Sequence, residues 1–259
     1  MMNDAKNKGF SFEQTKELKL GVKQGIDVSI YADNTYNYVQ MREIRLGLVD
    51  GLDVSIYAHK YFSGVQMREI RLGLSEKINV TIYAKPDISS AKMREIRLGI
   101  EKNININDYN NKKFTSKQMH EIYLGELAKI DTSMYAKNVF SYKQMREIRL
   151  GLCEGLYAAI YAHSEFSEEQ MFQIRLGLKE KLEVQVYADP KFSVEQMKEI
   201  RIGLMRHLNV GLYANQYMPP ELMAELRNKL ERCKNIVKSE LDNQKQYEQI
   251  SFGRFLLSK

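Results

Sequence analysis

The sequence repeats itself every 26 residues, and this period constrains the fold more than any other feature. The block MREIRLGL at residues 41–48 returns with few changes at residues 67–74, 93–100, 145–152, 171–178 and 197–204. A fixed period between about 20 and 50 residues is typical of a solenoid or another repeat array. Two columns keep this spacing through eight repeats: the glycines Gly21, Gly47, Gly73, Gly99, Gly125, Gly151, Gly177 and Gly203, and the tyrosines Tyr31, Tyr57, Tyr83, Tyr109, Tyr135, Tyr161, Tyr187 and Tyr213.

The array has no insertion, so no repeat has room for an active-site loop that the others lack. We expect an N-terminal tail at residues 1–10, one elongated repeat domain at residues 11–217, and a C-terminal capping helix and tail at residues 218–259. The capping helix is expected to reach about Gln246, with residues 252–257 folding back. A coiled-coil arm is the alternative role for this helix, so the oligomeric state stays open between a monomer and a dimer through the C-terminal helix.

Each repeat begins with two signals for the start of a helix. A Ser, Thr or Asn is followed three residues later by Gln, as in Ser63 and Gln66, which is the pattern of a capping box. An apolar residue before the cap and Met at the fourth helical position form a hydrophobic staple. Only Ser89 lacks the glutamine. These signals predict a helix from about Ser63 to Glu76, with a counterpart in every repeat.

A second, shorter element follows each of these helices. Gly25, Gly51 and Gly155 are suited to a left-handed helix end, as is Asn103. Asp53 is then a good N-cap for the run Val-Ser-Ile-Tyr-Ala at residues 54–58. The β-branched residues of this run also suit a short strand, whereas the Asp cap and the closing Ala favour a helix. We therefore predict an all-α protein, an α-solenoid of about eight helical hairpins with a long C-terminal capping helix.

A helical wheel of residues 41–48 separates a core stripe from two flanks. Met41, Ile44 and Leu48 share one stripe, which we expect to face the second helix layer and the tyrosine column. Gly47 lies on one flank, where a small residue is expected to let the next helix approach closely. Arg45 lies on the other flank.

Two arginine columns have two alternative roles. The planar fork of arginine is suited to phosphates, so both columns are candidates for binding the backbone of RNA or DNA. A carboxylate column that includes Glu43 accompanies them, which favours inter-repeat salt bridges for the column of Arg45. The candidate nucleic-acid-binding residues are Arg42, Arg45, Arg68, Arg71, Arg94, Arg97, Arg146, Arg149, Arg175 and Arg201.

The Leu46 column lies away from the core stripe although it is apolar in every repeat. An apolar ladder flanked by Arg42-type and Glu43-type residues describes a groove for a partner's helix or extended segment. The alternative is that the helices pack tightly enough to bury the ladder as well. The candidate partner-binding residues of this column are Leu46, Leu72, Leu98, Leu124, Leu150 and Leu176.

Repeats five to seven depart from the consensus at columns outside the core stripe. Aromatic residues anchor protein interfaces, so such substitutions are candidate contacts for a partner, with neutral drift or a local bend as the alternative. The segment from Asn103 to Asn111 departs as well. The candidate contact residues are His120, Tyr123, Tyr157 and Phe172.

Catalytic chemistry has no support in the sequence, and we expect no enzyme, no cofactor and no metal site. The histidines are scattered without a zinc spacing, and the glycines are single and periodic rather than grouped in a phosphate loop. Cys153 and Cys233 stand in unrelated contexts, so no disulfide framework is predicted. No apolar run approaches the roughly 18 residues of a membrane span, and residues 1–10 lack the apolar core of a secretory signal. We therefore expect a cytoplasmic protein without membrane contact.

The motif from Gln40 to Ala58 resembles a short repeat of uncharacterised bacterial proteins, often carried by phages and plasmids. The resemblance extends over residues 11–217 and implies no established activity and no functional residues. It implies a role in the conflict between mobile elements and host defence, such as an inhibitor that binds a nuclease complex. The leading hypothesis is a non-enzymatic solenoid that binds a protein partner, and binding of RNA or DNA is the alternative. A net charge of +6 favours acidic partners only mildly.

Overall fold

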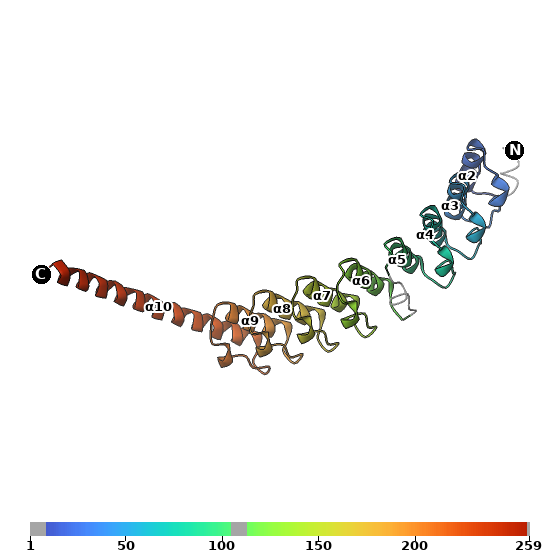
Figure 1. The fold of residues 1–259 in the computed structure, drawn as a ribbon. Helices are drawn as coiled ribbons and strands as arrows, with labels where there is room; N and C mark the ends of the chain where they lie inside the picture. Colours follow the sequence, from blue (N-terminus) through green and yellow to red (C-terminus); the bar gives the residue numbers. More distant parts are fainter. Residues whose placement is uncertain (1–8, 105–112, 258–259) are drawn as a thin grey trace. The chain divides into compact units, whose positions relative to one another are not determined.

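The computed structural model describes residues 9–104 and 113–257, with side chains as far as residue 246. Every regular element within these ranges is helical, which confirms the predicted fold class. The chain divides into two compact units, residues 1–129 and residues 130–259. In each unit the α helices lie side by side, and short 3₁₀ helices (η) with their loops form a second layer (Figure 1). Within the described ranges, no helix combines the length and the apolarity that a membrane span requires.

Each of the helices α2 to α9 has twelve residues and opens one repeat. Unit 1 contains α2 (Phe12–Lys23), η1 (Val28–Ile30), α3 (Tyr38–Val49), η2 (Val54–Ile56), α4 (Gly64–Ser75), η3 (Val80–Ile82), α5 (Ser90–Glu101) and α6 (Ser116–Leu127). Unit 2 contains η5 (Thr132–Met134), α7 (Tyr142–Cys153), η6 (Ala158–Ile160), α8 (Glu168–Lys179), η7 (Val184–Val186), α9 (Val194–Met205), η8 (Val210–Leu212) and α10 (Pro220–Leu257).

The predicted capping boxes are present at the start of every α helix from α2 to α9 except α5. In α4 the hydroxyl of Ser63 accepts from the backbone N–H of Gln66 at 3.2 Å. The backbone N–H of Ser63 in turn donates to Oε1 of Gln66 at 2.8 Å. Ser89 caps α5 with its side chain alone, as its sequence predicts. Phe62 and Met67 are 1% and 0% exposed and complete the staple beside the Ser63 cap.

The helices end as the glycine pattern predicts. Gly25, Gly51 and Gly155 have φ between 68° and 72°, and Asn103 has φ of 55°. At the end of α3 the backbone N–H of Leu52 donates to the carbonyl of Gly47 at 2.9 Å, which completes a Schellman motif. The other left-handed helix ends are Lys77, Lys129, Lys181 and His207. Each of these four carries a side chain in a conformation that costs about 1 kcal/mol.

Where the second element of a repeat falls within the described residues, it is a 3₁₀ helix of three residues, shorter than the run of five residues at positions 54–58. Asp53 caps η2, since its carboxylate accepts from the backbone N–H of Ser55 at 3.0 Å. Asp27, Asn79 and Asp131 cap their own short helices in the same way. The prediction of a helix rather than a strand is therefore confirmed.

The tyrosine column fills the core between the two layers, as expected. Tyr57 is fully buried, and its hydroxyl donates to the carbonyl of Glu43 at 3.1 Å. A Cβ atom on Gly47 would lie 1.9 Å from that hydroxyl oxygen. The glycine thus makes room for the tyrosine of its own repeat. Our prediction that it makes room for the helix of the next repeat is wrong. Gly21, Gly73, Gly151, Gly177 and Gly203 meet their own tyrosines in the same way. Tyr109 lies outside the described residues.

The last helix, α10, continues to Leu257, so the predicted fold-back of residues 252–257 is wrong. Its first turns pack on α9: Met223 is fully buried, and Nε of Arg227 donates to Glu199 at 2.7 Å. From residue 232 to residue 246 every side chain is exposed. The first turns of α10 therefore cap the array, and its role as a dimer arm stays a prediction.

Candidate partner-binding surface

Arginines of the Arg45 column join consecutive helices. Arg97 on α5 donates from Nε to Glu69 on α4 at 3.1 Å and from Nη1 to Glu76 at 2.8 Å. Arg97 and Glu69 are both 8% exposed, so the ion pair lies within the contact between two repeats. The interpretation as inter-repeat salt bridges is confirmed for this pair and for Arg45 with Glu17, Arg71 with Glu43, Arg175 with Glu147 and Arg227 with Glu199.

Because of these ion pairs, the paired arginines of the Arg45 column are not free to bind the phosphates of a nucleic acid. We expected the Glu43-type residues to flank a groove, but Glu17, Glu43, Glu69, Glu147 and Glu199 are the carboxylates of these ion pairs, and Glu43 is 5% exposed. Arg201 is half-buried and donates to Gln173 at 3.1 Å and to Glu180 at 3.0 Å, and Arg149 is half-buried as well. Of the two predicted arginine columns, only that of Arg42 projects into solvent.

Tyr123 belongs to the contact between repeats and not to the surface. It occupies the Arg45 column on α6 and is 7% exposed, which corrects its prediction as a contact residue for a partner. The position that is Asp50 after α3 and Glu76 after α4 is Lys102 after α5. Because Lys102 would repel an arginine in the next repeat, a tyrosine at position 123 removes the repulsion. The tyrosine at position 123 is therefore explained by the contact between neighbouring repeats.

Six capping-box glutamines also bond to the next repeat, a contact that we did not predict from the sequence. Gln40 accepts at Oε1 from the backbone N–H of Asn37 at 2.8 Å and donates from Nε2 to the carbonyl of Phe62 at 2.7 Å. Glu would satisfy a capping box but has no N–H to donate. Seven of the eight repeats have Gln at this position, Lys92 is the exception, and none has Glu; this preference for Gln over Glu is the signal that could have revealed the second bond.

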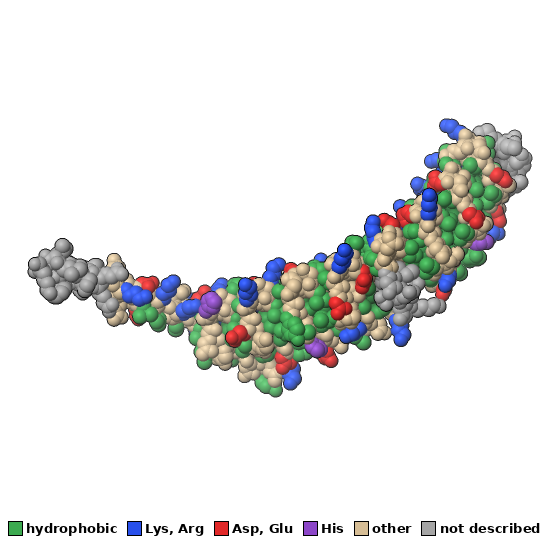
Figure 2. Space-filling model, viewed as in Figure 1, with side chains coloured by type: hydrophobic (Ala, Val, Ile, Leu, Met, Phe, Trp, Pro, Cys, Tyr) green, Lys and Arg blue, Asp and Glu red, His purple; other side chains and the backbone are tan. Residues whose placement is uncertain are grey.

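The arginines of the Arg42 column lie on the open face, the name we give to the α-helix positions of Tyr38, Val39, Arg42, Leu46 and Val49 and their counterparts in other repeats. At 100° per residue Arg42 lies roughly 140° from Gly47, which contacts the short-helix layer, so this face points away from that layer. Arg42, Arg68, Arg94 and Arg146 are exposed, and none forms an ion pair with a described residue. Figure 2 shows Lys and Arg side chains projecting from successive helices with hydrophobic side chains between them.

The Leu46 column is half-buried in every repeat, so it is neither a fully exposed ladder nor a core column. This holds for the predicted residues Leu46, Leu72, Leu98, Leu124, Leu150 and Leu176. Apolar neighbours on the same face are more accessible: Tyr38 is 49%, Val49 is 44% and Val65 is 54% exposed. We did not single out these neighbours because their columns are not apolar in every repeat.

The remaining aromatic candidates lie at separate places. His120 occupies the Arg42 column on α6, with Nδ1 3.0 Å from a carboxylate oxygen of Glu95. Phe172 occupies that column on α8 and is 39% exposed, and the guanidinium of Arg175 lies 5.5 Å from its ring centroid. Tyr157 is 71% exposed but precedes η6, in the layer of short helices, so the structure does not bring it onto the open face.

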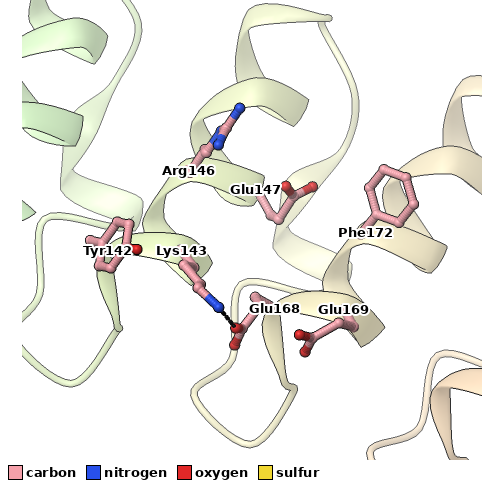
Figure 3. Close-up of a pocket in the computed structure, with 7 residues that line it drawn as sticks. All are labelled: Tyr142, Lys143, Arg146, Glu147, Glu168, Glu169 and Phe172. Carbon is pink, nitrogen blue, oxygen red and sulfur yellow. Dashed lines mark hydrogen bonds and ion pairs between the residues drawn. The ribbon is translucent and has the colours of Figure 1, made fainter.

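A shallow pocket of about 280 Å³ adjoins Phe172 between α7 and α8 (Figure 3). Its lining residues are Tyr142, Lys143, Arg146, Glu147, Glu168, Glu169 and Phe172. Lys143 and Glu168 form an ion pair at 2.7 Å, and Glu147 accepts from Arg175 at 2.9 Å. The charges of this pocket are therefore largely matched within the protein. No group of three metal-ligating side chains occurs among the residues that the structure describes.

Comparison of the chain with models of protein families, with curated proteins and with solved structures finds no match. The function has to be inferred from the open face itself.

Proposed function

We propose that the protein is a non-enzymatic solenoid that binds a partner protein along its open face. One observation carries the proposal: the open face repeats a half-buried leucine in every repeat and an exposed cation in most of them, and Arg42, Arg68, Arg94 and Arg146 form no ion pair with a described residue. Other repeated side chains serve the core, the contacts between repeats or the helix caps. Half-exposed leucines beside exposed valines give a partner apolar surface to cover, and apolar contact in the centre of an interface is a main source of affinity.

The resemblance to repeats of phages and plasmids supports a more specific form of the proposal. In that form the partner is a nuclease complex of host defence, which the solenoid inhibits by binding. The cytoplasm is the compartment in which such a partner would be met.

Affinity purification with the intact chain tests the proposal. The captured proteins should be lost with Leu72→Ser, Leu98→Ser and Leu150→Ser combined, while far-UV circular dichroism keeps its helical signal. Because these leucines are half-buried, the exposed Val65→Ser provides a second test that does not depend on packing. Val139→Ser is its matched control, since Val139 is 63% exposed in a loop away from the open face. Capture that is unchanged in all the open-face variants would contradict the proposal.

Binding of RNA or DNA is the second candidate, and the exposed guanidinium groups of Arg42, Arg68 and Arg94 favour it. Phosphate contacts release counterions, so the affinity should fall steeply between about 50 and 200 mM salt. Absence of binding at the lower salt concentration would exclude this candidate.

A further inference from the structure

We infer that the open face of unit 1 binds an extended protein segment that carries a carboxylate at about every third residue, with apolar side chains between the carboxylates. This inference rests on the proposed function and specifies the partner's chemistry. It follows from the charges, the apolar side chains and the spacing of helices α3, α4 and α5.

The charges on this surface are unbalanced. Arg42, Arg68 and Arg94 project from three successive helices without an ion pair among the described residues. The carboxylates beside them are engaged: Glu76 is paired with Arg97 at 2.8 Å, and Glu101 with Lys102 at 2.9 Å. Asp50, the third, lies 3.6 Å from Arg71. A partner with carboxylates therefore meets free cations without displacing an existing ion pair.

The apolar side chains distinguish a protein partner from a nucleic acid. Val49 and Val65 are 44% and 54% exposed next to the arginines, and the leucines at positions 46, 72 and 98 are half-exposed. A phosphodiester backbone binds the arginines but leaves these aliphatic groups in water. Apolar side chains of a peptide can cover them, and this burial favours association.

The spacing of the helices sets the register of the partner. Packed helices lie about 8–10 Å apart. A partner segment in the polyproline II conformation has three residues per turn and advances roughly 3.1 Å per residue, so every third side chain points to the same side. Three residues of the partner therefore span about one repeat, so a carboxylate at every third position meets one arginine per helix. With carboxylates at every second position the spacing is roughly 6.2 Å and successive carboxylates point to different sides, so the register is lost by the second helix.

The test uses the intact chain and two fluorescein-labelled peptides of twelve residues with the same composition of Asp, Leu and Ser. In one peptide Asp recurs at every third position, and in the other the aspartates are adjacent. A single-stranded oligothymidylate is the nucleic-acid probe. At about 50 mM salt we expect the spaced peptide to bind about tenfold more tightly than the clustered one, as measured by fluorescence anisotropy.

Two triple variants assign the binding to the open face. Arg42→Glu, Arg68→Glu and Arg94→Glu combined should weaken binding of the spaced peptide by about tenfold or more. The control combines the exposed loop substitutions Lys85→Glu, Lys137→Glu and Lys191→Glu, which change the net charge equally, and should retain the affinity. Circular dichroism should give the same unfolding midpoint for both variants as for the wild type.

The inference is overturned if the spaced peptide does not bind, if it binds no better than the clustered peptide, or if the arginine variant binds as the wild type does. Tighter binding of the oligothymidylate through the same arginines also overturns it. Leucine-dependent capture of a partner that persists in the arginine variant would leave the proposed function intact and refute only this inference.

Discussion

Substitution of Gly73 by alanine should destabilise the protein, although alanine is the better helix former. At an exposed position inside a helix, Gly to Ala stabilises by about 1 kcal/mol. At Gly73 the new Cβ would lie 1.9 Å from the hydroxyl oxygen of Tyr83, about 1.5 Å short of the 3.4 Å at which ordinary contact begins. Tyr83 is fully buried, and its hydroxyl donates to the carbonyl of Glu69 at 3.2 Å, so the ring has little freedom to withdraw. Overpacking of this kind costs about 1–3 kcal/mol, and we expect a net loss of about 2 kcal/mol.

A double-mutant cycle identifies the clash. Tyr83→Phe removes the atom that the new Cβ would meet first, and on its own it costs about 1 kcal/mol for the lost hydrogen bond. Gly73→Ala in the Tyr83→Phe background should therefore cost at least about 1 kcal/mol less than in the wild type. Gly51→Ala is the control for backbone strain alone, because Gly51 has φ of 68° and no atom within 4 Å of the new Cβ.

Urea unfolding followed by circular dichroism measures all four variants. Neighbouring repeats share their interfaces, so the cost is expected to appear in the unfolding of the array and not in one repeat alone. A Gly73→Ala protein as stable as the wild type would refute the assignment of the glycine column to the tyrosine hydroxyl. An equal cost of the substitution in both backgrounds would refute it as well.

Three further predictions concern the contacts between repeats, the buried tyrosines and the last helix. Gln66→Glu keeps the capping box but loses the bond of 2.8 Å from Nε2 to the carbonyl of Ile88, and should lower the free energy of unfolding by about 1–3 kcal/mol in urea titrations near pH 7. Burial raises the pKa of Tyr31 to about 12, and it raises the pKa of the other shifted column tyrosines too. The unfolded chain then loses these protons from about pH 10 while the folded protein keeps them, so stability should be full below pH 10 and fall as pH rises toward 12. Tyrosinate absorbance and circular dichroism should change together in that range, and tyrosinate that forms without loss of helix would contradict the burial. Truncation after Lys238 should leave the unfolding midpoint unchanged because the described side chains that it removes, at residues 239–246, are all exposed. Truncation after Met218 removes the buried Met223 and should lower the midpoint.

The helix boundaries could be predicted from the sequence because their signals are local. A capping box spans four residues, and a Schellman motif spans six. The helix predicted from about Ser63 to Glu76 has Ser63 as its N-cap and Glu76 as its C-cap. Tertiary structure has little influence on such signals, so each repeat reports its own limits.

The partners of side chains around each helix could be predicted only in part, because a wheel gives angles and not the placement of neighbours. It placed Gly47 on a flank but could not show that Tyr57, ten residues later, folds back onto it. The wheel also could not decide the exposure of the Leu46 column, which depends on how far successive helices are rotated against each other. The salt-bridge ladder was predictable because its two columns have opposite charge and recur together.

Of the two arginine columns that we predicted for the candidate surface, only one is exposed, because a helical wheel does not show where the neighbouring helices lie. Arg42 and Arg45 are separated by roughly 60° on a wheel, which is too little to assign one to solvent and the other to a contact. The structure separates them: Arg45 is 6% exposed and paired with Glu17, whereas Arg42 is exposed.

The open face combines a repeated cation with neighbours that differ between repeats, and this contrast bears on function. Shared descent of the repeats alone does not explain the retained cation, because the adjacent position on the same face reads Val49, Ser75 and Glu101 in three successive repeats. Stacking does not explain it either, since arginines at positions 42, 68 and 94 form no ion pair with any described residue. Lys or Arg is retained in six of the eight repeats of this column, with His120 and Phe172 as the exceptions, and we propose that a ligand outside the chain contacts it. The varied neighbours then supply the discrimination between one partner and another, because only they differ from repeat to repeat along the surface.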